Sequence, residues 1–320
     1  ERFESVALDT QFRVRGERDA GGEVVLVLID EKSLIEVGRW PWPRTTQARL
    51  IGQLSAAAPR VIGLDLIYSE ADRDVGQERL KELLSKGRAQ APVSSDAMQA
   101  LERYLREPSP DQQLASSLKA AGSVVLATPF FVPETLGSHR TQTFAAQSIT
   151  GLEGREFMLV RQAGALDGLQ PYEATASLLP VEVLSEQAQA MGHVYRLPDH
   201  DGVTRHEVLA VKYRDAYYPS FALEVARLYL GIPRDRMALS LGEGVRLGDT
   251  LVPTDQKLRT MLNYAGRDLH FPWVSATDVL HGRVSPDVIR GKAVLVGTAA
   301  LGTYDQLSTP FSANFPGVEK

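Results

Sequence analysis

The sequence predicts an α/β fold, with a mostly parallel central sheet flanked by helices and an inserted, more antiparallel β-rich portion. Three short apolar runs support this prediction, namely residues 24–30 (VVLVLID), 60–68 (RVIGLDLIY) and 293–300 (AVLVGTAA). Each run is bounded by turn-forming or charged residues, which is typical of strands buried on both faces of a parallel sheet. A helical pattern separates the first two runs, so they form a strand–helix–strand unit with parallel strands and a right-handed crossover.

The composition is that of a globular protein and excludes several kinds of site. The chain has 320 residues, 43% of them hydrophobic and 23% charged, and a net charge of −5. Charges of both signs are interspersed, so we expect no nucleic-acid partner. Because there are no cysteines, disulfides and thiolate metal sites are excluded. No apolar run approaches the ~18 residues that cross a bilayer. The chain starts on Glu1 rather than Met, so we expect that an N-terminal segment, with room for a membrane helix, precedes it.

The first third of the chain alternates helices and strands. An apolar stripe of Phe3, Val6, Leu8, Phe12 and Val14 predicts a helix over 1–15. A second helix follows over 45–58 with Thr45 or Thr46 as its N-cap. Residues 76–107 contain helical patches at 77–86 and 96–106 and look like an insertion, which we expect to form a lid, a dimer surface or neither. A capping box that starts at Ser109 predicts the next helix, and 123–131 is a third strand.

The middle of the chain, 132–270, has a different character. Residues 132–156 resemble a loop, and 193–220 predict two strands around the turn at Asp201–Gly202. Ser220 caps a helix over 220–230, and two strand pairs follow at 245–253 and 258–264. The helix at 275–282 begins with a capping box of Ser275 and Asp278. We therefore interpret 1–320 as one domain: a linking helix in 1–22, a core in 23–131 and 271–320, and an antiparallel insertion in 132–270.

Three carboxylates stand at or near the ends of predicted strands: Asp30, Asp65 and Asp305. Ligands of parallel α/β sheets bind beyond the carboxyl ends of the strands, so these acids are candidates for one shared cleft. There they would hold Mg²⁺ or Ca²⁺, or pair with a basic group. The plainer interpretation is that each acid caps a helix or binds loop amides. No metal and no cofactor is predicted; if a metal binds, these three acids are its candidate ligands.

Other motifs carry little chemistry. The acids in 69–76 (SEADRDVG) have the spacing of a calcium loop, but the glycine comes one residue late, so a solvated loop is favoured. The run 297–302 (GTAALG) lacks the spacing of a phosphate loop and is better explained by close strand-to-loop packing. The sequence shows no nucleophile with a neighbouring base. The hypothesis that the protein is an enzyme therefore depends on the three carboxylates alone.

Residues 40–44 (WPWPR) form a stiff aromatic segment that ends in a cation. Trp40 and Trp42 either form an aromatic floor for a ligand or cover the core. Arg44 precedes a helix N-terminus, where the helix dipole favours anions. We therefore expect a carboxylate to hold Arg44, with Asp30 and Asp65 as candidates, or Arg44 to help the free helix amides bind an anionic ligand.

The order of motifs along the chain resembles the CHASE type 2 (CHASE2) sensory domain, the extracytoplasmic input module of bacterial transmembrane receptors. The resemblance spans nearly the whole chain. It is carried by residues 8–16 (LDTQFRVRG), 24–44 (VVLVLIDEKSLIEVGRWPWPR), 48–70, 122–129, 192–205 (GHVYRLPDHDGVTR), 218–228, 274–282, 294–311 (VLVGTAALGTYDQLSTPF) and 315–319 (FPGVE).

This resemblance implies a domain outside the cytoplasmic membrane, with membrane segments just before Glu1 and just after Lys320. The implied partners are the protein's own transmembrane helices and a cytoplasmic output domain: a nucleotide or diguanylate cyclase, a histidine kinase or a Ser/Thr kinase. The signal is an unidentified small molecule or protein, and we expect a homodimer. The domain itself is not expected to be an enzyme.

The positions that match the family's polar and aromatic pattern are Asp30, Ser33, Trp40, Trp42, Arg44, Asp65, Glu70, Asp201, Arg205, Asp305 and Pro310. Eight of them are our candidate ligand-binding residues: Asp30, Ser33, Trp40, Trp42, Arg44, Asp65, Arg205 and Asp305. There are two alternatives to a sensory function. The protein could be a metal-dependent hydrolase that uses the three aspartates, or a ligand-free mechanical dimerisation module.

Overall fold

A computed structural model describes residues 2–72, 76, 78–80, 82, 95–133, 151–164, 167–303 and 305–320. The helices are α1 (Arg2–Arg15), α2 (Glu31–Val37), α3 (Arg44–Ala56), α5 (Ser95–Arg106), α6 (Pro110–Ala121), α8 (Glu182–Ser185), α9 (Phe221–Tyr229) and α10 (Ala276–Leu280), with 3₁₀ turns η1 (Arg234–Arg236), η2 (Pro286–Val288), η3 (Leu301–Thr303) and η4 (Gly317–Glu319).

The strands of the central sheet are β1 (Val24–Ile29), β2 (Val61–Leu64), β3 (Val124–Thr128), β8 (Ala190–His193), β16 (Trp273–Ser275) and β17 (Ala293–Thr298). The other strands are β4 (Phe130–Phe131), β5 (Leu159–Gln162), β6 (Glu173–Ala174), β7 (Ala176–Ser177), β9 (His206–Val208), β10 (Ala210–Tyr213), β11 (Ala216–Pro219), β12 (Met237–Leu241), β13 (Gly244–Leu247), β14 (Thr250–Pro253), β15 (Arg259–Met261), β18 (Gln306–Leu307) and β19 (Phe315–Pro316).

The core is a parallel sheet of six strands in the order β16-β1-β17-β2-β3-β8, and every neighbouring pair runs parallel. This confirms the predicted α/β class and the three apolar strands. The first two predicted strands, β1 and β2, are parallel but are not neighbours, because β17 pairs with both of them.

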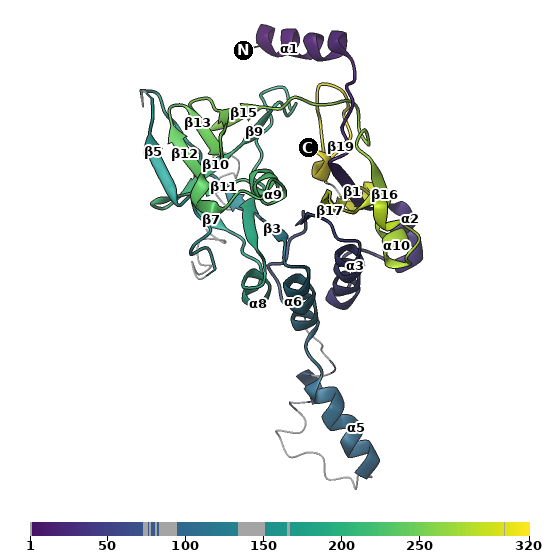
Figure 1. The fold of residues 1–320 in the computed structure, drawn as a ribbon. Coiled ribbons are helices and arrows are strands. Elements are labelled where there is room, and N and C mark those ends of the chain that lie inside the picture. Colours follow the sequence, from purple (N-terminus) through teal and green to yellow (C-terminus); the bar gives the residue numbers. More distant parts are fainter. Residues whose placement is uncertain are drawn as a thin grey trace.

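Alternate residues of each strand face opposite sides of the sheet. On one side, Val25, Val27 and Val294 belong to the main core, which includes Leu50 and Leu54 of α3 and residues of α6. On the other side, α9 packs on β2, β3 and β8, and η4 packs on β17 (Figure 1). This second side is thus covered by one helix and one short turn.

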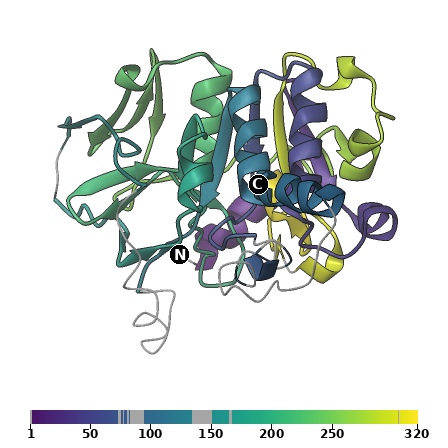
Figure 2. The same cartoon turned by 90° about the horizontal axis from the view of Figure 1, so that it is seen from below.

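The stretch 132–270 contains most of the antiparallel pairs, including the β10–β11 hairpin and the meander β12-β13-β14. It has an apolar cluster of its own around Met237, Leu239 and Val245. However, the same stretch also supplies β8 and α9 to the parallel core. Figure 2 shows this β-rich part beside the parallel core.

The turn at Asp201–Gly202 does not join a hairpin, contrary to the sequence prediction. The strand before it, β8, enters the central sheet, and the strand after it, β9, pairs with β15. The hairpin of this region is β10–β11, which turns at Arg214 with a φ of 55°. The wrong pairing arose because strand neighbours in the sheet are set by long-range packing and not by the turn residues alone.

Two helix starts also differ from prediction. Helix α3 begins at Arg44 after Pro43, without a Thr45 or Thr46 cap; its first amide donates to Asp72 Oδ2 at 2.8 Å. The capping box predicted at Ser275 is absent as well, because the amide of Thr277 donates to Ser33 Oγ at 3.1 Å. In contrast, the capping box of Ser109 and the cap by Ser220 are confirmed.

Helix α1 confirms the predicted N-terminal helix, and α5 confirms one of the two in the 76–107 stretch. The two helices lie at opposite ends of the molecule (Figure 1). The other helix predicted there, 77–86, lies mostly outside the described residues, as does most of the predicted loop at 132–156. The predicted apolar stripe of α1 is only partly packed, since Phe12 is buried whereas 61% of Val6 is exposed.

The contact between β8 and α9 depends on the absence of a side chain at Gly192. A Cβ at that position would lie 2.5 Å from the backbone nitrogen of Phe221. Gly52, on the exposed side of α3, has nothing within 4 Å of the same position. The first glycine is therefore required by packing, and the second is not.

We expect Gly192→Ala to destabilise the protein by about 1–3 kcal/mol or more, because α9 would have to move off the sheet. Gly52→Ala is the matched control and should stabilise by about 0.5–1 kcal/mol, since alanine favours a helix interior. Urea denaturation of both variants measures these changes. Equal stability of the two variants would contradict the predicted role of Gly192.

Candidate functional site

A pocket of about 700 Å³ lies on the sheet side that α9 and η4 cover. Its floor is formed by β1 and β17, including Leu26 and Leu295. Phe221 and Val225 of α9 line one side, and Val318 and Lys320 at the chain's C-terminal end line another. The pocket exists because α9 and η4 each cover only part of this sheet side.

Close packing of η4 defines one wall of this pocket. Gly297 of β17 has no side chain in the way, and a Cβ there would lie 2.6 Å from Cβ of Val318. Of the two glycines in 297–302, Gly297 thus shows the close packing that the sequence predicted, whereas Gly302 has nothing within 4 Å of its Cβ position.

Asp65 lies directly after β2 and faces the pocket. It continues the alternation of Val61 and Gly63, so the chain delivers its carboxylate to the side where α9 and η4 lie. No hydrogen bond or ion pair of this carboxylate to the described residues is found. Burial, and next the Asp305 carboxylate, raise the pKa of Asp65 to about 7.

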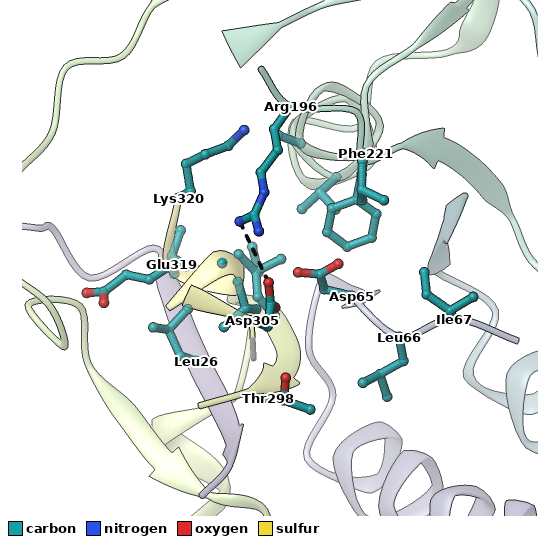
Figure 3. Close-up of a pocket in the computed structure, with 18 of the residues that line it drawn as sticks. Leu26, Asp65, Leu66, Ile67, Arg196, Phe221, Thr298, Asp305, Glu319 and Lys320 are labelled. Carbon is teal, nitrogen blue, oxygen red and sulfur yellow. Dashed lines mark ion pairs between the residues drawn. The ribbon is translucent and has the colours of Figure 1, made fainter. Parts of the chain in front are cut away.

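Asp305 follows β17 and η3, and its side chain converges with those of Asp65 and Arg196 (Figure 3). Its Oδ1 lies 3.8 Å from Nη1 of Arg196, and both side chains are about one-third exposed. Burial raises the pKa of Asp305, and the positive charges of Arg196 and Lys320 oppose this rise. The pocket therefore brings together two carboxylates and one loosely held guanidinium.

His193, at the end of β8, also lines the pocket and is 1% exposed. Burial, and next the charge of Lys320, lower its pKa to about 3, so the ring is neutral. The amide of Tyr195 donates to Nδ1 at 3.3 Å, which places the ring proton on Nε2. This Nε2 has no hydrogen-bond partner among the described residues.

Beside the pocket, one short segment binds both ends of the chain. The buried Arg205 donates to Asp9 of α1 through Nε and Nη2, at 2.8 and 2.9 Å, and also binds Asp199 and Asp201. Two residues further on, Glu207 pairs with Lys320. Phe12 of α1 packs between the rings of Tyr264 and Phe311, in a cluster that includes Leu307 of the pocket wall.

The structure places four of the eight predicted site residues at the pocket: Trp40, Arg44, Asp65 and Asp305. Asp30 does not line it. The Asp30 carboxylate caps α2 by accepting from the amide of Ser33 at 2.9 Å, and it accepts from Ser275 Oγ at 2.7 Å. Ser33 is buried in the same network. Trp42 is 3% exposed in the main core, and Arg205 binds α1.

Arg44 does not meet Asp30 or Asp65, contrary to the sequence prediction. Its Nε lies 3.2 Å from Asp111 Oδ1, and its guanidinium stacks 4.5 Å from the centre of the Tyr68 ring. Asp111 belongs to α6, which packs against α3. The partner was missed because this helix pairing brings together residues far apart in the chain.

Sequence analysis also missed His193, Arg196, Glu207 and Lys320. His193 ends a buried strand and Arg196 follows it, so the rule that ligands bind at the carboxyl ends of strands would have found them. Glu207 was detectable as a charge inside a strand pattern. Nothing in the sequence indicates that Lys320 reaches it.

Within the described part of the chain, no group of three or more His, Cys, Asp or Glu side chains is arranged to hold a metal ion. The three aspartates of the hydrolase alternative are all described, and only two of them share the pocket. In that same part of the chain, no helix has both the length and the apolar character needed to span a membrane.

The structure is thus an α/β domain with a pocket whose wall contacts helix α1 through the cluster of Leu307 and Phe12. Residues 1–320, the whole chain, match the CHASE2 domain family, and the protein belongs to that family. CHASE2 domains are extracytoplasmic sensory domains. Neither a curated protein nor a solved structure matches the chain.

The raised pKa of Asp65 predicts a pH-dependent effect of Asp65→Asn on stability. Because the folded-state pKa is about 7 and the ordinary value is 3.8, this carboxyl favours folding fully below pH 3.8, and the benefit is lost as pH rises through 7. Asparagine does not ionise. The stability of the variant relative to the natural protein should therefore rise by about 2–4 kcal/mol between pH 4 and pH 8.

Urea denaturation at the two pH values measures this difference. Asp249→Asn is the control, since the side chain of Asp249 is 97% exposed and lies away from the pocket. A difference for Asp65→Asn that stays flat with pH would show that Asp65 ionises as it does in the unfolded chain.

Proposed function

We propose that this domain is the signal-input part of a membrane-bound bacterial receptor, with the pocket as its ligand site and α1 as its output element. The receptor would regulate a cytoplasmic nucleotide or diguanylate cyclase, histidine kinase or Ser/Thr kinase. Its signal would be a small molecule or a protein. Its own flanking transmembrane helices and its output domain would be partners, and it would act as a homodimer. Family membership supports the sensory role.

The observation that carries the proposal is the short path between the pocket and α1. Glu207 lines the pocket and pairs with Lys320, and Arg205, two residues away, binds Asp9 of α1. Leu307 lines the pocket and belongs to the cluster that packs on Phe12. A ligand that moves Lys320 or Leu307 would therefore change how α1 is held.

Such a path transmits a signal only if the ligand binds two arrangements of α1 with different affinity. The contacts on the two sides of α1 suit this requirement. Phe12 is buried, whereas Val14, two residues later, is 82% exposed. The docked arrangement therefore depends on a small number of contacts, which include Phe12 and Asp9.

We expect Phe12→Ala to change the catalytic rate of the cytoplasmic domain in the full-length receptor by about fivefold or more, because it loosens α1 from the pocket wall. Val14→Ala is the matched control on the same helix and should leave this rate unchanged. The rate is measured in membranes, with equal amounts of receptor. Equal rates for natural protein and Phe12→Ala would show that α1 docking does not set the output.

A substitution in the pocket tests the other end of the path. Ala222 of α9 is exposed and lines the pocket. Ala222→Trp would fill the pocket mouth without touching α1, and it should shift the same catalytic rate. An unchanged rate would separate the pocket from the output.

A further inference from the structure

The walls of the pocket are mostly apolar. Leu26 and Leu295 of the sheet, Phe221 and Val225 of α9, and Leu66 after β2 surround most of its space. Such walls offer water few hydrogen-bond partners, whereas the hydrocarbon part of a ligand is stabilised there by burial. A ligand for this pocket therefore needs an apolar body.

The polar end of the pocket has an excess of negative charge. Asp65 and Asp305 face the cavity, and the Arg196 guanidinium lies 3.8 Å from Asp305. The charge of Lys320 also acts on both carboxyls, but its ammonium group pairs with Glu207. When both carboxyls are ionised, the net charge of Asp65, Asp305 and Arg196 is one negative charge. The Asp65 carboxylate has no hydrogen bond or ion pair to the described residues.

The remaining charges of the lining add no net positive charge to this sum. Glu207 pairs with Lys320, and Arg44 pairs with Asp111. The Glu319 carboxylate accepts from the amides of Leu269, His270 and Phe271 at 2.6–3.2 Å and points away from Asp305 (Figure 3). His193 is neutral, and its Nε2–H group is buried without a hydrogen-bond partner among the described residues.

We propose that the pocket binds an organic monocation, an amine whose ammonium group lies between Asp65 and Asp305 and whose apolar body lies between α9 and the sheet. The ammonium group supplies the hydrogen-bond donors that the Asp65 carboxylate lacks and cancels the excess charge. An anion would add to that charge, since Arg196 and Lys320 already face carboxylates. The inference rests on the proposed function only in taking this pocket as the signal site.

Three probes of the same shape test the charge requirement on the 320-residue chain. They are cyclohexylmethylammonium, the neutral cyclohexylmethanol and the anionic cyclohexanecarboxylate. In titration calorimetry at pH 8, the ammonium should bind about tenfold or more tightly than the alcohol. The carboxylate should bind more weakly than either. Binding of the carboxylate as tight as that of the ammonium, or no binding by any of the three, would overturn the proposal.

Substitution of Asp65 tests its role in binding the ammonium group. Asp65→Asn should reduce the ammonium affinity to that of the alcohol and leave the alcohol affinity unchanged, whereas the control Asp249→Asn should change neither. The unchanged alcohol affinity shows that the pocket is still folded. Full ammonium affinity in Asp65→Asn would overturn the proposal.

Protonation gives an independent readout. The cation needs ionised Asp65, so its affinity should fall about tenfold from pH 8 to pH 6. At pH 7, binding should release about half a proton, which calorimetry in buffers of different ionisation enthalpy detects. The alcohol should show neither effect. Uptake of protons, or tighter binding at pH 6, would contradict the role of Asp65.

The two proposals fail separately. If Ala222→Trp and Phe12→Ala alter the receptor's output while the ammonium does not bind, the pocket is a signal site for another chemical class. If the ammonium binds as expected and neither variant alters the output, the assignment of the ligand is supported and the proposed coupling of the pocket to α1 is wrong.

Discussion

The fold depends on one strand that comes late in the chain and lies in the middle of the sheet. β17 pairs with β1 on one side and with β2 on the other. Without β17, the backbone N–H and C=O groups on the facing edges of β1 and β2 would be buried without hydrogen-bond partners. The sheet is therefore completed only when residues 293–298 are in place.

The position of β17 also explains why the pocket lies where it does. The chain leaves β17 at the centre of the sheet and returns through β18 and β19 to η4, which packs back on β17 itself. This returning segment is short, so it covers only part of the sheet side that α9 leaves open. Most doubly wound sheets cover both sides with helices. Here the uncovered area becomes the floor of the pocket, and Asp305 and Lys320 reach its wall because they belong to the returning segment.

The sequence predicted the parts of this structure that depend on local patterns. Apolar runs identified β1, β2 and β17, and the capping box at Ser109 identified α6, because burial and helix ends have local signatures. Asp65 was found as an acid at a strand end. What failed depended on distant neighbours: the central place of β17, the pairing of β9 with β15, and the contact of Arg44 with Asp111. Asp30 and Asp65 are both acids at strand ends, but Asp30 directly precedes α2 and caps it by accepting from the amide of Ser33, which was the plainer of its two interpretations.

The segment from Arg205 to Glu207 has a structural consequence. It binds α1 through Asp9 and the C-terminal end through Lys320, so it joins two parts of the domain that lie far apart in the sequence. Helix α5 projects at the far end of the molecule from α1 (Figure 1). A change in chain length near α5 would therefore leave the link between α1 and Lys320 in place.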